Sequence, residues 1–276
     1  MKIIPVGSSN KLLPTMKNIY FAARTFRKIR KKTRFIADHI SQLEKDGFEE
    51  PIVVVGYPKS GNTWLTRLIA DTLNCPSKGY AGIPCNHDIA VEGEERASNR
   101  FLLKSHHVRA TWDRVRHPRV KMISIVRDPR DVAASGAHYH FHNQPGAAAN
   151  MVSLMTTERH GHYWNRRSWA GYVDDFLAAG IPLIRYEDLL ADTEASLARL
   201  LTEAGLDFDP ERLAKAVENQ SFDKARARYF EAGNADRIRH MRCGRVGSHA
   251  EELPPQEVSR LSRALAPTMI DLGYLR

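Results

Sequence analysis

The chain has 276 residues, and 42% of them are hydrophobic, which is enough for one large buried core. No run approaches eighteen apolar residues, and the first residues lack the apolar segment of a secretory signal, so we expect neither a membrane-spanning helix nor export. Three cysteines, Cys75, Cys85 and Cys243, show no metal-type pairing, which is typical of a cytoplasmic protein.

The net charge of +9 comes from the N-terminal part of the chain. Residues 1–34 hold ten lysines and arginines and no acid, whereas the other 31 basic residues are balanced by 32 acidic ones. Residues 14–46 carry apolar side chains at helical spacing among these charges, which predicts a basic, partly amphipathic helix. This helix either packs on the body or makes a peripheral contact with a membrane surface or an acidic partner. We therefore divide the chain into a basic helical arm, 1–46, and a domain, 47–276.

Beyond the arm, short apolar runs alternate with helical patterns. The runs predicted to form strands are 52–55, 101–103, 120–126 and 181–184, and the first of them is β-branched, as in buried parallel strands. Helices are expected at about 63–73, from Asp128 onward, and at about 160–179, 192–204 and 254–271, whereas 137–162 and 224–250 look irregular. The pattern predicts a single α/β domain with a central, mostly parallel sheet flanked by helices. Ligands of such sheets bind beyond the carboxyl ends of the strands.

A glycine-containing loop follows the first predicted strand and reads Gly56-Tyr57-Pro58-Lys59-Ser60-Gly61-Asn62-Thr63-Trp64. Between a strand and a helix, backbone amides and the helix N-terminus can hold an anion. The loop departs from a Walker A pattern, because Asn62 replaces the lysine and the only lysine, Lys59, lies earlier. Taken alone, it is equally well a structural turn.

A second polar segment, Arg127 to Ser135, follows the third predicted strand. A P-loop kinase needs an aspartate at a strand end for Mg²⁺, but Arg127 stands there and can bind a phosphate through two hydrogen bonds. Ser135 lies about two helical turns later and returns near the same face. A Mg²⁺-dependent P-loop kinase is the alternative enzyme, and a nucleic-acid-binding protein that uses the basic arm is the non-enzymatic alternative.

Together, the two segments resemble the sulfotransferases that use 3′-phosphoadenosine-5′-phosphosulfate (PAPS). Residues 58–64 match the family's P-K-S/A-G-T/N-T-W element, and residues 127–135 match its R-N/D-P-x-D-x-x-x-S element. Further matches follow in the family's order, namely Lys104-Ser105-His106, Tyr186-Glu187-Asp188, Ser221-Phe222 and 242–247. The resemblance covers most of residues 51–276. It implies a P-loop, nucleotide-kinase-like fold, a cytosolic-type sulfotransferase, and PAPS as co-substrate without a metal.

The resemblance also implies roles for individual residues. His106 is the expected general base, because an imidazole can accept the acceptor's proton near neutral pH. Lys59 is expected to neutralise the leaving phosphate oxygen, and Lys104 to stabilise the oxygens of the transferring group. The residues implied in donor binding are Lys59, Ser60, Gly61, Asn62, Thr63, Trp64, Arg127, Ser135, Tyr186, Phe222, Arg242, Cys243 and Gly244. Among them, Trp64 and Phe222 are expected to sandwich the adenine, and Arg127, Ser135, Arg242 and Gly244 to bind the 3′-phosphate.

Two positions leave alternatives open. Cys243 stands where the family has a lysine, so 3′-phosphate binding is either weaker or compensated by Arg245 or Arg239. His107 is a competing base beside His106, but the family's spacing favours His106.

The acceptor is defined only as a small molecule, carbohydrate or lipid with a hydroxyl group, and nucleic acid is not expected as a partner. We expect the acceptor site to be built from about 80–90, 138–170 and 226–240. Five histidines in this part could suggest a metal site, but alternating positions spread around a helix. We therefore expect solvated or acceptor-pocket side chains at His138, His140, His142, His160 and His162.

Overall fold

The structure, a computed structural model, describes residues 16–84, 98–142, 144–157, 167–231, 233 and 244–276, with the backbone alone at 16–29, 84 and 229. Its sheet has the strand order β3-β2-β4-β1-β5-β6. The strands are β1 Glu50–Gly56, β2 Ser77–Tyr80, β3 Ile83–Pro84, β4 Arg100–Ser105, β5 Lys121–Val126 and β6 Leu183–Arg185. Five of them pair in parallel, and β3 pairs antiparallel with β2. The predicted α/β fold with a mostly parallel sheet is confirmed.

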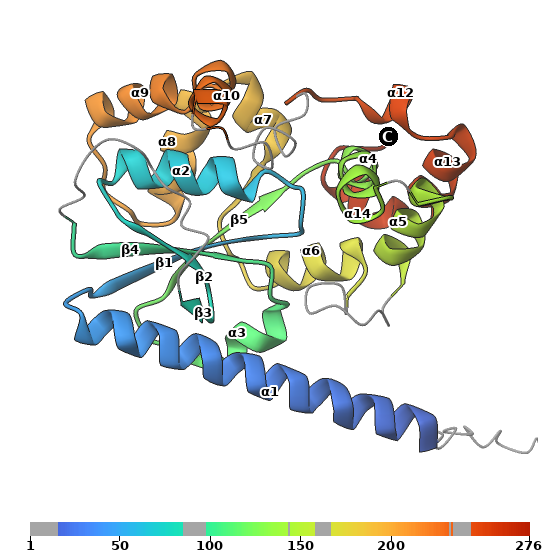
Figure 1. Cartoon of the computed structure of the whole chain (residues 1–276), viewed down its shortest axis with the longest axis horizontal. Coiled ribbons are helices and arrows are strands. Elements are labelled where there is room, and N and C mark those ends of the chain that lie inside the picture. The colour runs from blue at the N-terminus through green and yellow to red at the C-terminus, as the bar shows by residue number, and fades with distance from the viewer. Residues whose placement is uncertain (1–15, 85–97, 143, 158–166, 232, 234–243) are drawn as a thin grey trace, which may run out of the picture.

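Strand β1 is central because both of its faces are apolar. Ile52 and Val54 pack in one core with α2 (Asn62–Thr72), α8 (Thr193–Glu203) and α9 (Pro210–Asn219). Val53 and Val55 pack in the other core with α1 (Met16–Lys45) and α6 (Trp169–Leu177). Figure 1 shows α2, α8 and α9 on one face of the sheet, and α1 with α3 (Arg109–Val115) on the other. Alternate side chains of a strand point to opposite faces, so β1 is buried on both.

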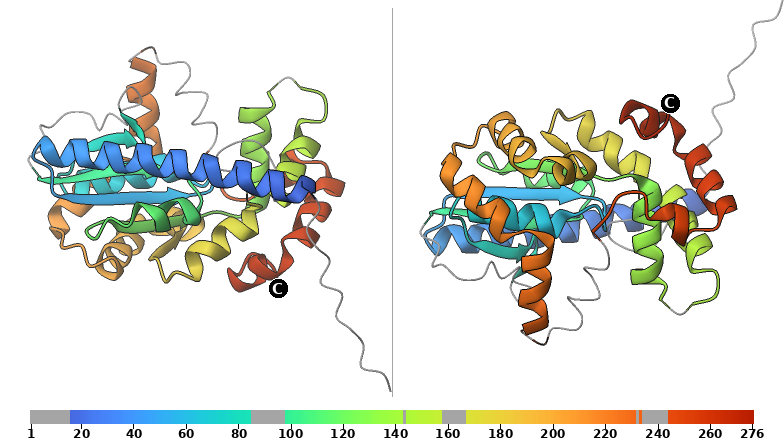
Figure 2. Two further views of the ribbon diagram at one scale, coloured as in Figure 1. Left: turned by 90° about the horizontal axis from the view of Figure 1, so that it is seen from below. Right: turned by 90° about the horizontal axis from the view of Figure 1, so that it is seen from above.

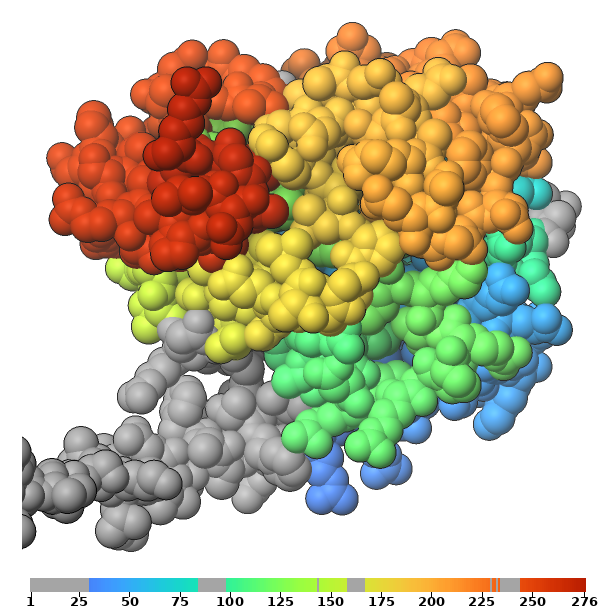
Figure 3. Space-filling view, turned by 180° about the vertical axis from the view of Figure 1, so that it is seen from behind, coloured from blue at the N-terminus to red at the C-terminus, as the bar shows by residue number. Residues whose placement is uncertain are grey.

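A group of helices lies beyond the carboxyl end of the sheet. It consists of α4 (Pro129–His140), α5 (Ala147–Thr156), α13 (Pro255–Ala264) and α14 (Ala266–Asp271). Both views in Figure 2 place this group at one end of the molecule, past the tips of the strands. From behind, the C-terminal residues lie beside the segment that contains α6 and α7 (Tyr186–Ala191) (Figure 3). The carboxyl edge of the sheet is thus enclosed by helices from several parts of the chain.

Helix α1 agrees with the predicted helix at 14–46, of which residues 14 and 15 lie outside the described part. Its second half packs on the body, since Ile36 and Ile40 are fully buried and α1 contacts α3. Its first half runs on past the sheet in Figure 1. The boundary between an arm and a domain at residue 46 stays a prediction. Among the described residues, no helix combines the length and apolar character needed to cross a bilayer.

Three expectations about the helices are wrong. The helix predicted at 254–271 is divided into α13 and α14 at Leu265, because Pro267 in the first turn of α14 has no N–H to continue a longer helix. The described part of 137–162 is mostly helical, since α4 extends to His140 and α5 occupies 147–156. The described part of the segment 224–250 contains most of α10 (Phe222–Glu231) and the start of the short α12 (His249–Glu252). Of the helix predicted at 160–179, the described part forms α6, with Ser168 capping its N-terminus.

Candidate active site

The loop between β1 and α2 has the geometry of an anion site. Lys59 and Gly61 both adopt positive φ, 72° and 99°, which turns the chain sharply before α2 begins. Gly61 caps α2 and has no side chain to bond to the amides of the first turn. The hydroxyl of Ser60 is fully buried and has no hydrogen-bond partner in the described part of the chain. Hydrogen-bond donors therefore gather at a helix N-terminus, where a negative group is favoured.

Two lysines and a histidine meet beside this loop. Lys104, near the end of β4, donates to Thr63 Oγ1 at 2.7 Å and to the Tyr80 hydroxyl at 2.8 Å. The Nζ atom of Lys59 lies 4.3 Å from the centre of the Tyr139 ring. His106 lies two residues beyond Lys104, and its Nδ1 atom is 2.7 Å from the carbonyl oxygen of Gly56. Residues from the end of β4 and from the loop that follows β1 thus form one basic cluster.

The environment of His106 keeps its imidazole neutral. Burial and the positive charge of Lys104 lower the pKa of His106 to about 3, with a smaller contribution from Lys59, although the hydrogen bond to Gly56 opposes them. A carbonyl oxygen can only accept, so Nδ1 carries the proton and Nε2 holds the free lone pair. His106 therefore presents an acceptor nitrogen, which is the form that a general base requires.

His107 is also buried, but its ring is fixed differently. Its Nε2 atom lies 3.3 Å from the carbonyl oxygen of Ala81, so this nitrogen carries the proton. Burial lowers the pKa of His107 to about 4. The two neighbouring histidines are thus both neutral at pH 7, and they are held by opposite ring nitrogens.

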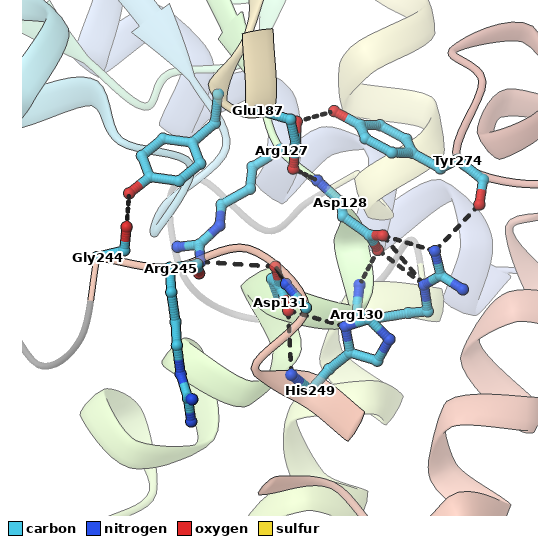
Figure 4. A network of polar contacts seen from close by, with 11 residues as sticks. Arg127, Asp128, Arg130, Asp131, Glu187, Gly244, Arg245, His249 and Tyr274 are labelled. Carbon is cyan, nitrogen blue, oxygen red and sulfur yellow. Dashed lines mark hydrogen bonds and ion pairs between the residues drawn. The ribbon is translucent and has the colours of Figure 1, made fainter. Parts of the chain in front are cut away.

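A second cluster forms around Arg127, directly after β5. The guanidinium is 4.4 Å from the centre of the Tyr186 ring, and its Nη2 atom donates to the carbonyl of Arg245 at 3.0 Å (Figure 4). The Tyr186 hydroxyl donates to the carbonyl of Gly244 at 3.2 Å. Arg127 Nε is buried and has no hydrogen-bond partner among the described residues. The arginine is therefore fixed in place and keeps a further donor.

Aromatic side chains connect the two clusters. Trp64 donates from Nε1 to the carbonyl of Gln220 at 3.0 Å, and its ring centre is 5.7 Å from that of Tyr186. Gly244 has φ +60°, and a Cβ atom there would lie 2.7 Å from the ring of Phe222. Gly61 is equally close to Tyr186, again with a Cβ position 2.7 Å from the ring. Only glycine fits at these two contacts.

The structure brings together most of the site residues predicted from the sequence. Ser135 is half-buried on α4, one turn after Asp131, as the predicted helix requires. Arg242 and Cys243 lie outside the described residues, so their predicted role at the 3′-phosphate stays a prediction. His160 and His162 also lie outside them, and within the described part no three His, Cys, Asp or Glu side chains are placed to hold a metal ion.

Two carboxylates were assigned no role in the sequence analysis, although both belong to the matched motifs. Asp131 is fully buried and binds residues 247 and 249. Glu187 accepts from the Asp128 amide at 2.9 Å and from the Tyr274 hydroxyl at 2.8 Å, and burial raises its pKa. Figure 4 shows both carboxylates beside the turn that follows Arg127. Their positions in the matched motifs could have drawn attention to them, but their hydrogen-bond partners are distant in sequence.

Comparisons with known proteins extend over most of the chain. The family model "Sulfotransferase domain" matches residues 49–273. Sulfotransferase 1E1 of Cavia porcellus is 26% identical over 203 residues, which cover 63% of this chain and 65% of that protein. Cytosolic sulfotransferase 15 of Arabidopsis thaliana is 25% identical over 265 residues, which cover 81% of this chain and 72% of that protein. The match thus spans slightly less than two thirds of the first of these relatives.

Solved structures share the fold. Mouse sulfotransferase SULT7A1, complexed with 3′-phosphoadenosine-5′-phosphate (PAP), superimposes with a TM-score of 0.64 at 23% identity and covers 86% of this chain and 91% of that one. Retinol dehydratase, in complex with androsterone and inactive cofactor PAP, superimposes with a TM-score of 0.56 at 18% identity and covers 81% of this chain and 82% of that one. At these identities the likeness establishes the architecture.

Proposed function

The chain belongs to the sulfotransferase domain family, and we propose from this premise that it transfers a sulfuryl group from PAPS to an acceptor hydroxyl. The observation that carries the proposal is the pair of clusters at the carboxyl edge of the sheet. One contains Lys59, Lys104 and His106, and the other is centred on Arg127. PAPS carries negative groups at its 5′ and 3′ positions, so two separate basic clusters suit its charge distribution.

The residues present fit the donor. The amides at the start of α2, which follow a glycine N-cap, and the buried Ser60 hydroxyl can bond to a 5′-phosphate. Arg127 can direct its remaining donor at the 3′-phosphate. The rings of Trp64 and Phe222, which lie against Tyr186 and Gly244, would hold the adenine. All the positive charge comes from side chains, so the proposed chemistry needs no metal.

We assign His106 as the general base. As the acceptor oxygen forms its bond to sulfur, its proton passes to Nε2 of His106, and the bond between sulfur and the bridging phosphate oxygen breaks. PAP leaves with that electron pair, and Lys59 stabilises the charge on its oxygen. A negative group held between Lys59 and Lys104 opposes their effect on His106, so the base is stronger when the donor is bound than the pKa of about 3 indicates.

The acceptor is proposed to enter beside Tyr80 and Tyr139. Tyr80 contacts Lys104, and Tyr139, about half exposed, lies over Lys59, so both rings border the place where the sulfuryl group is transferred. Aromatic borders suit a hydroxylated small molecule, and a carbohydrate or lipid acceptor remains within the proposal. Peripheral membrane contact through α1 and a cytoplasmic location stay predictions.

Turnover of PAPS tests the function. PAP formation is measured with panels of phenols, sugars, lipids and natural-product alcohols, with the His106→Ala variant as control. We expect at least one class to give PAP together with a sulfated product, and the variant to lose this turnover. If no class is sulfated and PAPS is not consumed, the proposed transfer is contradicted.

A further inference from the structure

Asp131 is a buried carboxylate that the proposed chemistry does not use. It lies on α4, one turn after Arg127, and its side chain is 0% exposed. Its Oδ2 atom accepts from the Gly247 amide at 2.8 Å. Its Oδ1 atom accepts from the His249 amide at 3.1 Å and from His249 Nδ1 at 2.8 Å. All three donors belong to one short segment, residues 244–249, which we call loop 244–249 (Figure 4).

The other end of the same loop touches the second basic cluster. The carbonyl of Gly244 accepts from the Tyr186 hydroxyl at 3.2 Å, and the carbonyl of Arg245 accepts from Arg127 at 3.0 Å. The Cβ position at Gly244 is only 2.7 Å from the Phe222 ring, so the loop backbone lies directly on that ring. Loop 244–249 therefore joins the proposed adenine and 3′-phosphate residues at its start to Asp131 at its end.

Asp131 also faces Arg127 itself, with Oδ2 and Nη2 3.7 Å apart. Burial favours the neutral acid, but the hydrogen bonds from His249 and Gly247 and the charge of Arg127 outweigh it and lower the pKa of Asp131. The carboxylate is thus ionised at neutral pH, and hydrogen bonds to an ionised group are stronger than those between neutral groups. One side chain therefore fixes both the arginine and the loop that lies across it.

We propose that Asp131 is a positioning residue that sets the spacing between Arg127 and loop 244–249, and thereby gives the site its selectivity for a nucleotide with a 3′-phosphate. The inference rests on the proposed function. Asp131 acts through Arg127 and the loop, and its carboxylate does not contact the donor, since like charges repel. A purely structural residue would affect stability without changing the preference between nucleotides with and without the 3′-phosphate.

The test compares the binding of PAP and adenosine 5′-phosphate by calorimetry. Asp131→Asn keeps the size of the side chain but replaces one acceptor oxygen with an NH₂ donor, so it breaks part of the connection to the loop. We expect the affinity for PAP to fall by about tenfold or more, with the affinity for adenosine 5′-phosphate within about twofold of the original chain. Asp175→Asn is the matched control, because Asp175 also pairs with an arginine, Arg167, but lies on α6; it should leave both affinities unchanged.

A second variant serves if Asp131→Asn does not fold. His249→Ala removes one side-chain donor from Asp131 and leaves the carboxylate in place, so a smaller fall in the PAP preference is expected. Equal losses for both nucleotides, or an unchanged preference in the folded variants, would overturn the inference. If the original chain binds both nucleotides equally, the proposed function itself is contradicted and the inference falls with it.

Discussion

At the scale of single residues, the tautomer of His106 leads to a sharp prediction. Nδ1 donates to Gly56 and leaves Nε2 as the proton acceptor, so replacing the ring removes the base but little of the donor site. His106→Ala is expected to lower kcat by about 10²–10⁴-fold and to leave the affinity for PAP nearly unchanged. Steady-state kinetics and calorimetry measure the two effects. His107→Gln is the control. If it lowers kcat while His106→Ala does not, the general base is His107 and the assignment of His106 is wrong.

The two basic clusters are expected to respond differently to mutation. Lys59 meets charge that develops during transfer, so Lys59→Ala should mainly lower kcat. Arg127 meets charge that the donor carries throughout, so Arg127→Ala should weaken PAP binding by about 1.5–3 kcal/mol, or roughly ten- to a hundredfold. Kinetics at saturating PAPS separate the two effects. The opposite pattern, in which Lys59→Ala affects only binding and Arg127→Ala only turnover, would contradict the assignment of Lys59 to the transferring group and of Arg127 to the 3′-phosphate.

The positions of the candidate site residues were largely predictable because they follow strands. Lys104, His106 and Arg127 each stand at or just after a strand end, where parallel sheets gather their ligands. The partners of Asp131 were not predictable, since Gly247 and His249 are more than 110 residues away and nothing local indicates the contact. The pKa of His106 is lowered mainly by burial, then by the nearby Lys104 and, less, by Lys59 from another segment, so it too required the fold.

At the scale of elements, loop 244–249 requires a glycine where it meets α10. Gly244→Ala places a Cβ atom 2.7 Å from the Phe222 ring at a φ of +60°, so the loop or the ring has to move. We expect this variant to lower the affinity for PAP by about tenfold or more. Gly180→Ala is the matched control, with φ +63° and nothing within 4 Å of its Cβ position. Both variants should lose thermal stability, because alanine is strained at positive φ, but Gly180→Ala should keep the affinity for PAP. Equal PAP affinities in both variants would show that the Gly244 contact does not shape the site.

Four of the six described strands were predicted, whereas β2 and β3 were not. An apolar run such as 52–55 identifies a buried strand directly, and β1 occupies it. The segment that contains α5 was misread because its glycine, asparagine and histidine content suggested a loop. Its apolar positions Met151, Val152, Leu154 and Met155 are buried against neighbouring helices, and this tertiary packing stabilises the helix.

At the scale of the whole molecule, the two buried histidines couple stability to pH. Their pKa values are lowered in the folded chain to about 3 for His106 and about 4 for His107, whereas an unfolded histidine titrates near 6.5. The unfolded chain therefore binds more protons below pH 6.5, so the stabilisation is present above that pH and is lost as the pH falls. Between pH 7.5 and 5 we expect a loss of about 2 kcal/mol for each histidine.

Urea unfolding at several pH values measures this dependence. Glu187, whose pKa is raised by burial, changes stability in the opposite direction, so the comparison has to be made between variants. The double variant His106→Gln/His107→Gln should show a flatter decline below pH 6.5 than the original chain. An identical pH slope in the two proteins would mean that these histidines are not held neutral in the fold.

The central claim is that the carboxyl edge of the sheet is a metal-independent site for a 3′-phosphorylated adenosine nucleotide. Calorimetric titration with PAP and with ATP, each in EDTA and then with excess Mg²⁺, tests it most directly. The arrangement of Lys59, Lys104 and Arg127 predicts that PAP binds in EDTA, and binds at least about tenfold more tightly than ATP, with little change when Mg²⁺ is added. Equal affinities for PAP and ATP, or binding only when Mg²⁺ is present, would contradict the account and favour a P-loop kinase.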